Sequence, residues 1–184
     1  LTDVLEYNKT SGLFLILAND TPVDEPGKYH GFFLRDSDPQ TKTASYTDLL
    51  LERGSKTMSQ KLSISLDNPW TTDFSFEGNG VRGADDFFYK PYLAALQHTD
   101  TAMVNLGYWA KPFILEDYQM DNHQMITYSV PLLYDGTVYG VLGVEISVCY
   151  MSRYFPVNDL DSSLNAGYAL VIDQGNGTYE GILG

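Results

Sequence analysis

The stretch that decides the fold is QMITYSVPLLYDGTVYGVLGVEIS, residues 124–147. Side chains in residues 124–133 alternate between two faces, which is the two-residue period of a β-strand, and residues 137–147 form the return strand. Asp135 and Gly136 stand between the two runs, and this dipeptide is a strong signal for a tight turn in which Gly136 takes a positive φ. The sequence therefore predicts an antiparallel β-hairpin over these residues.

Outward from the hairpin, short apolar runs predict strands, and apolar residues at helical spacing predict helices. The expected elements are strands at residues 13–18, 29–35 and 102–109, helices within 46–66, 87–98 and 149–154, and a last hairpin within 167–183. Helix and strand do not alternate throughout, as they would in a doubly wound α/β chain. The order predicts an α+β domain, an antiparallel sheet flanked by helices.

Composition narrows the class of protein. The chain has 184 residues, enough for one domain and part of a second, and 43% of them are hydrophobic, which argues against disorder despite a net charge of −13. An isoelectric point near 4.3 argues against nucleic acid or an anionic membrane surface as a partner. A single cysteine, Cys149, excludes an internal disulfide framework and a cysteine-based zinc site.

The chain carries no motif that predicts catalysis. It has no nucleophile elbow, no Walker loop and no zinc-protease signature. Gly78, Gly80 and Gly83 have the spacing of a dinucleotide loop, but no buried strand directly precedes them, so an ordinary loop is favoured. The adjacent acids Asp85 and Asp86 are typical of a helix start. No enzymatic activity, cofactor or metal site is expected.

Aromatic residues gather in the second half of the chain. They are Tyr89, Tyr92, Tyr108, Trp109, Tyr118 and Tyr128. Tyrosine and tryptophan combine a flat apolar face with a polar group, which suits a small-molecule pocket, but an aromatic core is the alternative reading. Glu145 interrupts an apolar strand, where an acid is costly unless it meets a ligand or pairs with a lysine, an arginine or a backbone donor.

Several of these segments together resemble a known family. Residues 108–113, the strand that ends in Val-Pro, the Asp-Gly turn and the run GVLGVEIS at 140–147 resemble the membrane-distal module of the double Cache domains. Those are PAS-like extracytoplasmic sensors of bacterial receptors. Residues 85–95, DDFFYKPYLAA, resemble the family's pocket helix.

The resemblance implies a domain organisation and a cellular context. Residues 1–155 would be the membrane-distal sensor module, and residues 156–184 a linker and the first hairpin of a truncated membrane-proximal module. Residues 1–10 would be the tail of a long N-terminal helix that rises from a membrane segment and is a candidate homodimer contact. The family implies a membrane-anchored parent, exposed on the extracytoplasmic face, with a diguanylate cyclase (GGDEF) or histidine kinase output.

The resemblance also implies a set of ligand-binding residues. They are Asp86, Phe88, Tyr89, Tyr108, Trp109, Tyr128 and Glu145. Members that bind free amino acids use an arginine where this chain has Asp86, and an aspartate where it has Glu145. An acid at the carboxylate clamp repels an anionic ligand, so a cationic, polyhydroxyl or heterocyclic ligand is expected unless Arg82 or Lys90 replaces the clamp.

Two other functional classes remain open at this stage. A carbohydrate-binding or adhesion module would present an exposed aromatic platform. A carboxylate-based hydrolase would hold two facing acids in an open cleft. A sensor would hold a small closed pocket between helix and sheet.

Overall fold

The computed structural model describes Leu5, Tyr7 and residues 9–19, 25–39, 47–78, 85–114, 124–160 and 166–183. The chain divides into two compact units. The first comprises Leu1–Ala110 with Thr127–Glu145, and the second comprises Lys111–Ile126 with Ile146–Gly184. Each unit is described by itself.

Strands account for most of the regular structure. They are β1 (Gly12–Leu17), β2 (Gly27–Tyr29), β3 (Gly31–Asp36), β4 (Leu49–Arg53), β5 (Ser65–Thr71), β6 (Phe74–Phe76), β7 (Tyr108–Trp109), β8 (Phe113–Ile114), β9 (Gln124–Tyr134), β10 (Thr137–Ser147), β11 (Leu170–Gly175) and β12 (Thr178–Leu183). The helices are α2 (Lys56–Leu62), α3 (Asp86–Gln97) and α4 (Val148–Ser152), with 3-10 turns η1 (Met103–Leu106) and η2 (Val157–Asp159).

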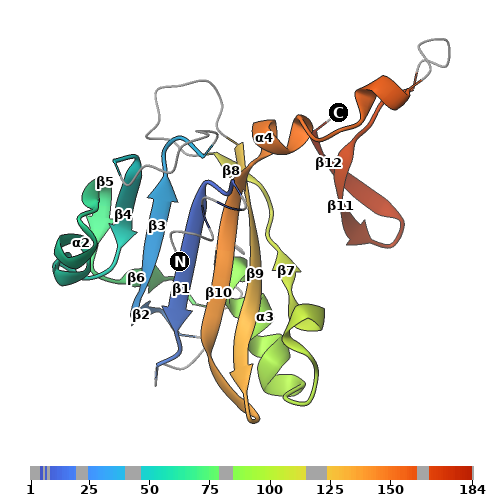
Figure 1. Ribbon diagram of the computed structural model, residues 1–184. Coiled ribbons are helices and arrows are strands. Elements are labelled where there is room, and N and C mark those ends of the chain that lie inside the picture. Colours follow the sequence, from blue (N-terminus) through green and yellow to red (C-terminus); the bar gives the residue numbers. More distant parts are fainter. Residues whose placement is uncertain are drawn as a thin grey trace. The chain divides into compact units, whose positions relative to one another are not determined.

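A large mixed sheet organises the first unit. Its strands run in the order β5-β4-β3-β1-β10-β9-β7, with β8 also paired to β9. The pairs β1–β3, β1–β10, β3–β4 and β7–β9 are antiparallel, whereas β4–β5 is parallel. Helix α3 lies against one face of this sheet, and α2 lies beside β4 and β5 (Figure 1). The predicted α+β architecture is confirmed in this coarse form.

The hairpin predicted from residues 124–147 is present. Strands β9 and β10 are neighbours in the sheet, and Asp135 and Gly136 between them have φ values of 47° and 71°. Positive φ at both central residues is the requirement of a type I′ turn. Glycine accepts this conformation without strain, and aspartate tolerates it better than most residues.

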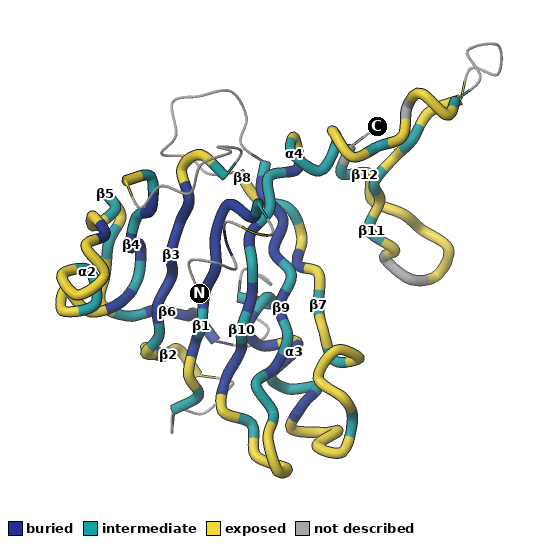
Figure 2. The backbone as a smooth tube through the Cα atoms, in the orientation of Figure 1, coloured by how far each residue is buried: buried dark blue, intermediate teal, exposed yellow. Residues whose placement is uncertain are grey.

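Side chains along the central strands point alternately to the two faces of the sheet, and each face carries its own hydrophobic core. In β1, Phe14 and Ile16 pack on the side that also buries Phe88 of α3, while Leu13 packs on the opposite side with Leu49 of β4. Figure 2 shows the middle strands as the most deeply buried part of the sheet. The small sheet β2–β6 adds aromatic side chains to the α3 side.

A proline within α3 ties the helix to β9. Pro91 has no N–H to donate to the carbonyl of Phe87, four residues earlier, and its ring crowds that carbonyl. The hydroxyl of Ser129 donates to the Phe87 oxygen instead, at 2.6 Å. Ser129 is fully buried, so a polar side chain in the core satisfies the helix position that the proline leaves open.

Two sequence predictions were wrong. Residues 46–66 were expected to be helical, but only α2 is helical there, because Leu49 and Leu51 alternate inward as a strand and are buried. A strand was expected over residues 102–109, but η1 occupies half of that range, Val104 is 71% exposed, and only Tyr108–Trp109 form a strand. Without a face to bury, a strand has nothing to pack against.

The N-terminal helix falls largely outside the described residues, of which Leu5 and Tyr7 are helical. Among the described residues, no helix is both long enough and apolar enough to span a bilayer.

The second unit contains β8, α4 and the hairpin β11–β12, whose strands are antiparallel. The hairpin is the one expected near the C-terminus. Asn176 and Gly177 form its turn with φ values of 58° and 74°.

Candidate functional site

The first turn of α3 brings together the acidic and aromatic residues that the sequence singled out. Asp85 occupies the N-cap position, but its side chain makes no capping hydrogen bond. Its Oδ2 instead accepts from the backbone N–H of Glu77 at 2.9 Å, and burial raises its pKa. Asp85, one of the two acids expected at the helix start, therefore fastens α3 to the preceding chain.

Asp86 is paired with Tyr108 of β7. Burial, then the charge of Asp86 and a hydrogen bond to it, raise the pKa of the Tyr108 hydroxyl. The nearby carboxylate disfavours ionisation of the tyrosine, so Tyr108 keeps its proton and can donate it to an acceptor at this turn. These two predicted site residues are in contact.

Phe88 and Tyr89 lie beneath this turn. Phe88 is fully buried and stacks on Tyr92, with ring centroids 5.3 Å apart. Tyr89 is 1% exposed, and its hydroxyl lacks a hydrogen bond of ordinary geometry in the described part of the chain. Burial and the nearby Tyr29 hydroxyl raise the pKa of Tyr89. We call Asp85, Asp86, Tyr89 and Tyr108 the α3 cluster.

The structure does not bring all the expected ligand-binding residues together. Tyr108 pairs with Ser129, which faces α3, whereas Trp109 pairs with Tyr128. Successive strand residues point to opposite faces, so Trp109 and Tyr128 lie on the face away from α3. Their rings contact each other at a centroid distance of 4.7 Å. The seven residues therefore do not face one common pocket, and their part in ligand binding stays a prediction.

Glu145 lies on the α3 side of the sheet but far along β10. It shares a face with Val141, which packs against Tyr89, and the regular register of β1 and β10 preserves the alternation. Four residues of strand place it about 13 Å from Val141. Lys90, one candidate for the missing clamp, is exposed on α3, and Arg82 lies outside the described residues.

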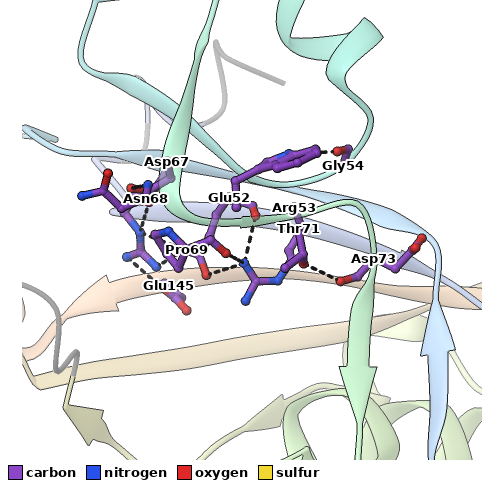
Figure 3. Close-up of polar contacts among 11 residues, drawn as sticks. Glu52, Arg53, Gly54, Asp67, Asn68, Pro69, Thr71, Asp73 and Glu145 are labelled. Carbon is purple, nitrogen blue, oxygen red and sulfur yellow. Dashed lines mark hydrogen bonds and ion pairs between the residues drawn. The ribbon is translucent and has the colours of Figure 1, made fainter.

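Glu145 pairs with a buried arginine. The guanidinium of Arg35, on β3, donates to Glu145 Oε2 from Nη1 at 3.3 Å and to Glu52 Oε2 from Nε at 3.0 Å and from Nη2. Its Nε also lies 3.7 Å from Asp67 Oδ2. Glu52, Asp67 and Glu145 converge from three strands in Figure 3. We call Arg35, Glu52, Asp67 and Glu145 the Arg35 cluster.

A glycine makes room for this ion pair. Gly12 of β1 is the register partner of Arg35 on one side and of Glu145 on the other. The two strands are therefore about 9.6 Å apart, and their long side chains meet above a residue that has none. A Cβ at Gly12 would lie 3.4 Å from the Glu145 Cβ and 2.6 Å from the ring of Phe33.

Burial dominates the electrostatics of the Arg35 cluster. It raises the pKa of Glu145 to about 7, against the opposing effect of Arg35, and the charge of Glu52 raises it further. Asp67 Oδ2 is buried and accepts no hydrogen bond within the residues that the structure describes. Arg53 adds a second guanidinium, whose Nη1 lies 3.3 Å from Glu52 Oε1.

Sequence reasoning missed most of this cluster. It treated Glu145 as a ligand contact or as half of an ion pair, and the structure bears out the ion pair. Arg35 interrupts the apolar run of β3 as Glu145 interrupts that of β10. An arginine and a glutamate in two otherwise apolar strands could have indicated a buried ion pair. The strand order that places the two residues on either side of Gly12 could not be predicted from the sequence.

Comparisons with known proteins place few constraints on function. No family model matches the chain, and no curated protein matches it at the required significance. Among solved structures, it is similar to the extracellular domain of a protein named as a histidine kinase, soHK1S-Z6, with 17% sequence identity and a TM-score of 0.42. The likeness covers 83% of this chain and 43% of that one, so the chain spans less than half of its length.

Proposed function

We propose that this chain is an extracytoplasmic sensor domain that binds a small molecule at the α3 cluster. The observation that carries the proposal is the Tyr89 hydroxyl, which is buried and has no hydrogen bond of ordinary geometry to any described residue. It lies next to a helix start that holds two carboxylates. A buried polar group is costly without a partner, and a bound ligand could supply one. The double Cache resemblance of residues 85–95 and 124–147 supports the same place.

The groups at the α3 cluster favour a ligand that donates hydrogen bonds. Asp86 is an acceptor close to the Tyr108 hydroxyl, and Asp85 is a second acid at the start of the same helix. Neither an arginine nor a lysine stands beside them in α3 before Lys90, which is exposed. A cationic or polyhydroxyl molecule fits these acceptors better than an anion does.

A binding screen with matched variants tests this proposal. Thermal melting of the chain is measured with panels of small amines, sugars and heterocycles. A true ligand at 100 times its dissociation constant should add about 2.7 kcal/mol of stability. Asp86→Asn should abolish most of that gain, while Asp100→Asn, an exposed acid just beyond α3, should keep it. Equal stabilisation of Asp86→Asn and the parent would contradict the proposed site.

The parent protein is proposed to be a membrane-anchored bacterial receptor with a diguanylate cyclase or histidine kinase output. Support for this context comes from the motifs in residues 108–147 alone. In this proposal the chain has no catalytic role. A homodimer through the N-terminal helix is part of the same proposal.

One observation favours a second candidate function, carbohydrate binding. Trp109 is 45% exposed and contacts Tyr128 on the face away from α3, so two aromatic rings lie at one surface. Their planes are tilted by 41°, whereas a flat platform would hold them nearly coplanar. Loss of sugar binding in Trp109→Ala, with Asp86→Asn unaffected, would favour this function over the sensor.

A further inference from the structure

Among the residues that the structure describes, the Arg35 cluster and the neighbouring Arg53 together carry more negative than positive charge. Arg35 and Arg53 supply two guanidinium groups, and Glu52, Asp67 and Glu145 supply three carboxylates. The side chains of Arg35, Asp67 and Glu145 are 5%, 8% and 7% exposed. An excess buried charge is costly, and the least expensive way to remove it is to bind a proton.

Hydrogen bonding distinguishes the carboxylates of the cluster. Glu52 receives two hydrogen bonds from Arg35 and lies beside Arg53 as well. Glu145 receives its hydrogen bond from Arg35 at the longer distance of 3.3 Å and is remote enough from Arg53 that this charge is the weakest of its influences. Of the two carboxylates that Arg35 holds by hydrogen bonds, Glu145 is therefore the one whose ionised form is less well compensated. Asp67, which lies 3.7 Å from Arg35 Nε and accepts no hydrogen bond at Oδ2 among the described residues, is the second candidate for the proton, and the titration of the Glu145 carboxyl distinguishes the two.

Glu145 also holds a backbone junction. Its carbonyl accepts from the N–H of Ser11 at 2.9 Å, and the carbonyl of Ser11 accepts from the N–H of Asp36 at 3.0 Å. These two bonds fasten β10 and β3 to the chain that enters β1. Glu145 is the last residue of the first compact unit, and β10 continues two residues later into α4.

We propose that the Arg35 cluster is a proton-operated clasp, which is closed when Glu145 holds a proton and loosens when Glu145 gives it up. With the proton bound, two carboxylates balance two guanidinium groups. Without it, one uncompensated charge remains beneath the Ser11 and Asp36 junction. The clasp makes the anchoring of β10 dependent on external pH, and it does not require a ligand at the α3 cluster.

The direction of the pH effect follows from the raised pKa of Glu145. A carboxyl group whose pKa is raised by folding stabilises the folded state while it is protonated, and this stabilisation is lost as the pH rises through the folded value. The pKa of Glu145 changes from 4.5 in the unfolded chain to about 7 in the folded one. The equilibrium constant for opening should therefore rise about tenfold between pH 6 and pH 8. Within the described part of the chain, the charged groups that act on Glu145 are Arg35 on β3 and Glu52 and Arg53 on β4, while Asp67 on β5 faces Arg35.

Native-state hydrogen exchange of the whole chain tests the clasp. The protection factors of the Ser11 and Asp36 amides, corrected for intrinsic rates, should fall about tenfold from pH 6 to pH 8. The amide of Ala95, a buried residue in the last turn of α3, should change much less. Glu145→Gln copies the protonated form and should remove the dependence on pH.

Asp36→Asn provides a matched control. Asp36 is also buried, and burial raises its pKa to about 6. Replacing its carboxyl group should therefore change the ratio of the protection factors at pH 6 and pH 8 by only about twofold. The carboxyl carbon resonance of Glu145 in the parent gives a reading that needs no variant, with an expected midpoint near pH 7. A midpoint near 4.5, an unchanged pH dependence in Glu145→Gln, or an equal loss at Ala95 would each overturn the clasp.

Discussion

The contact between Ser129 and the Phe87 carbonyl allows a sharp test of how α3 is held on the sheet. Ser129→Ala removes the donor and leaves the buried Phe87 carbonyl without a hydrogen bond, because Pro91 has no N–H to donate. An unsatisfied buried acceptor costs about 1–3 kcal/mol, so the free energy of unfolding should fall by that amount. For a chain of this size, each kcal/mol corresponds to about 2–4 °C in the melting temperature.

The proline makes the prediction specific. In a Pro91→Ala background, residue 91 has an N–H that can donate to the Phe87 carbonyl within the helix. In this background, the free energy of unfolding that Ser129→Ala removes should be smaller than in the parent by at least about 1 kcal/mol. A double-mutant cycle based on urea denaturation measures the difference. Equal costs in the two backgrounds would refute the view that Ser129 replaces the donor missing at Pro91.

Three further changes test the Arg35 cluster and the hairpin. Arg35→Met leaves three buried carboxylates without their main cation, so it should destabilise the fold at pH 8 by about 3–5 kcal/mol. The loss should be smaller at pH 5, because the carboxylates bind protons there. Lys90→Met removes the same charge at an exposed site and should cost under about 0.5 kcal/mol, and urea denaturation measures both variants. Gly12→Val places a branched side chain between Arg35 and Glu145 and against Phe33, so calorimetry should show a loss of about 1–3 kcal/mol. Gly136→Val should cost about 1–2 kcal/mol through its positive φ alone, since a Cβ there meets no atom within 4 Å, and an unchanged melting temperature would count against the type I′ turn.

Local signals in the sequence were sufficient for the elements whose pattern has a direct physical cause. The Asp135-Gly136 turn follows from the need for positive φ at both positions, and α3 follows from its apolar spacing and acidic start. Residues 46–66 misled because Leu49 and Leu50 fit a helical pattern, while the structure buries Leu49 and Leu51 at strand spacing. Periodicity cannot distinguish the two in a run this short.

The candidate site was less predictable, because it depends on which strands are neighbours. Tyr108 and Trp109 are adjacent in sequence, yet a two-residue strand sends them to opposite faces of the sheet. Glu145 and Arg35 are separated by 110 residues and meet only because β1 lies between β3 and β10 with a glycine at the crossing point. Long-range pairing of this kind is set by the whole sheet.

The hairpin that decides the fold also carries both polar anchors of the first unit. On β9, Ser129 holds the helix that bears the α3 cluster, and on β10, Glu145 holds the junction of β1 and β3. A change at the α3 cluster that shifted α3 would act on β9 through the Ser129 hydrogen bond and on the sheet through the core that Phe88 and Tyr89 share with it, whereas the proton at Glu145 acts on β10 directly. If both anchors bias the same pair of strands, the effects of Ser129→Ala and Glu145→Gln on the exchange of the Ser11 amide should be non-additive. Additive effects would mean that the helix and the clasp act on the sheet independently.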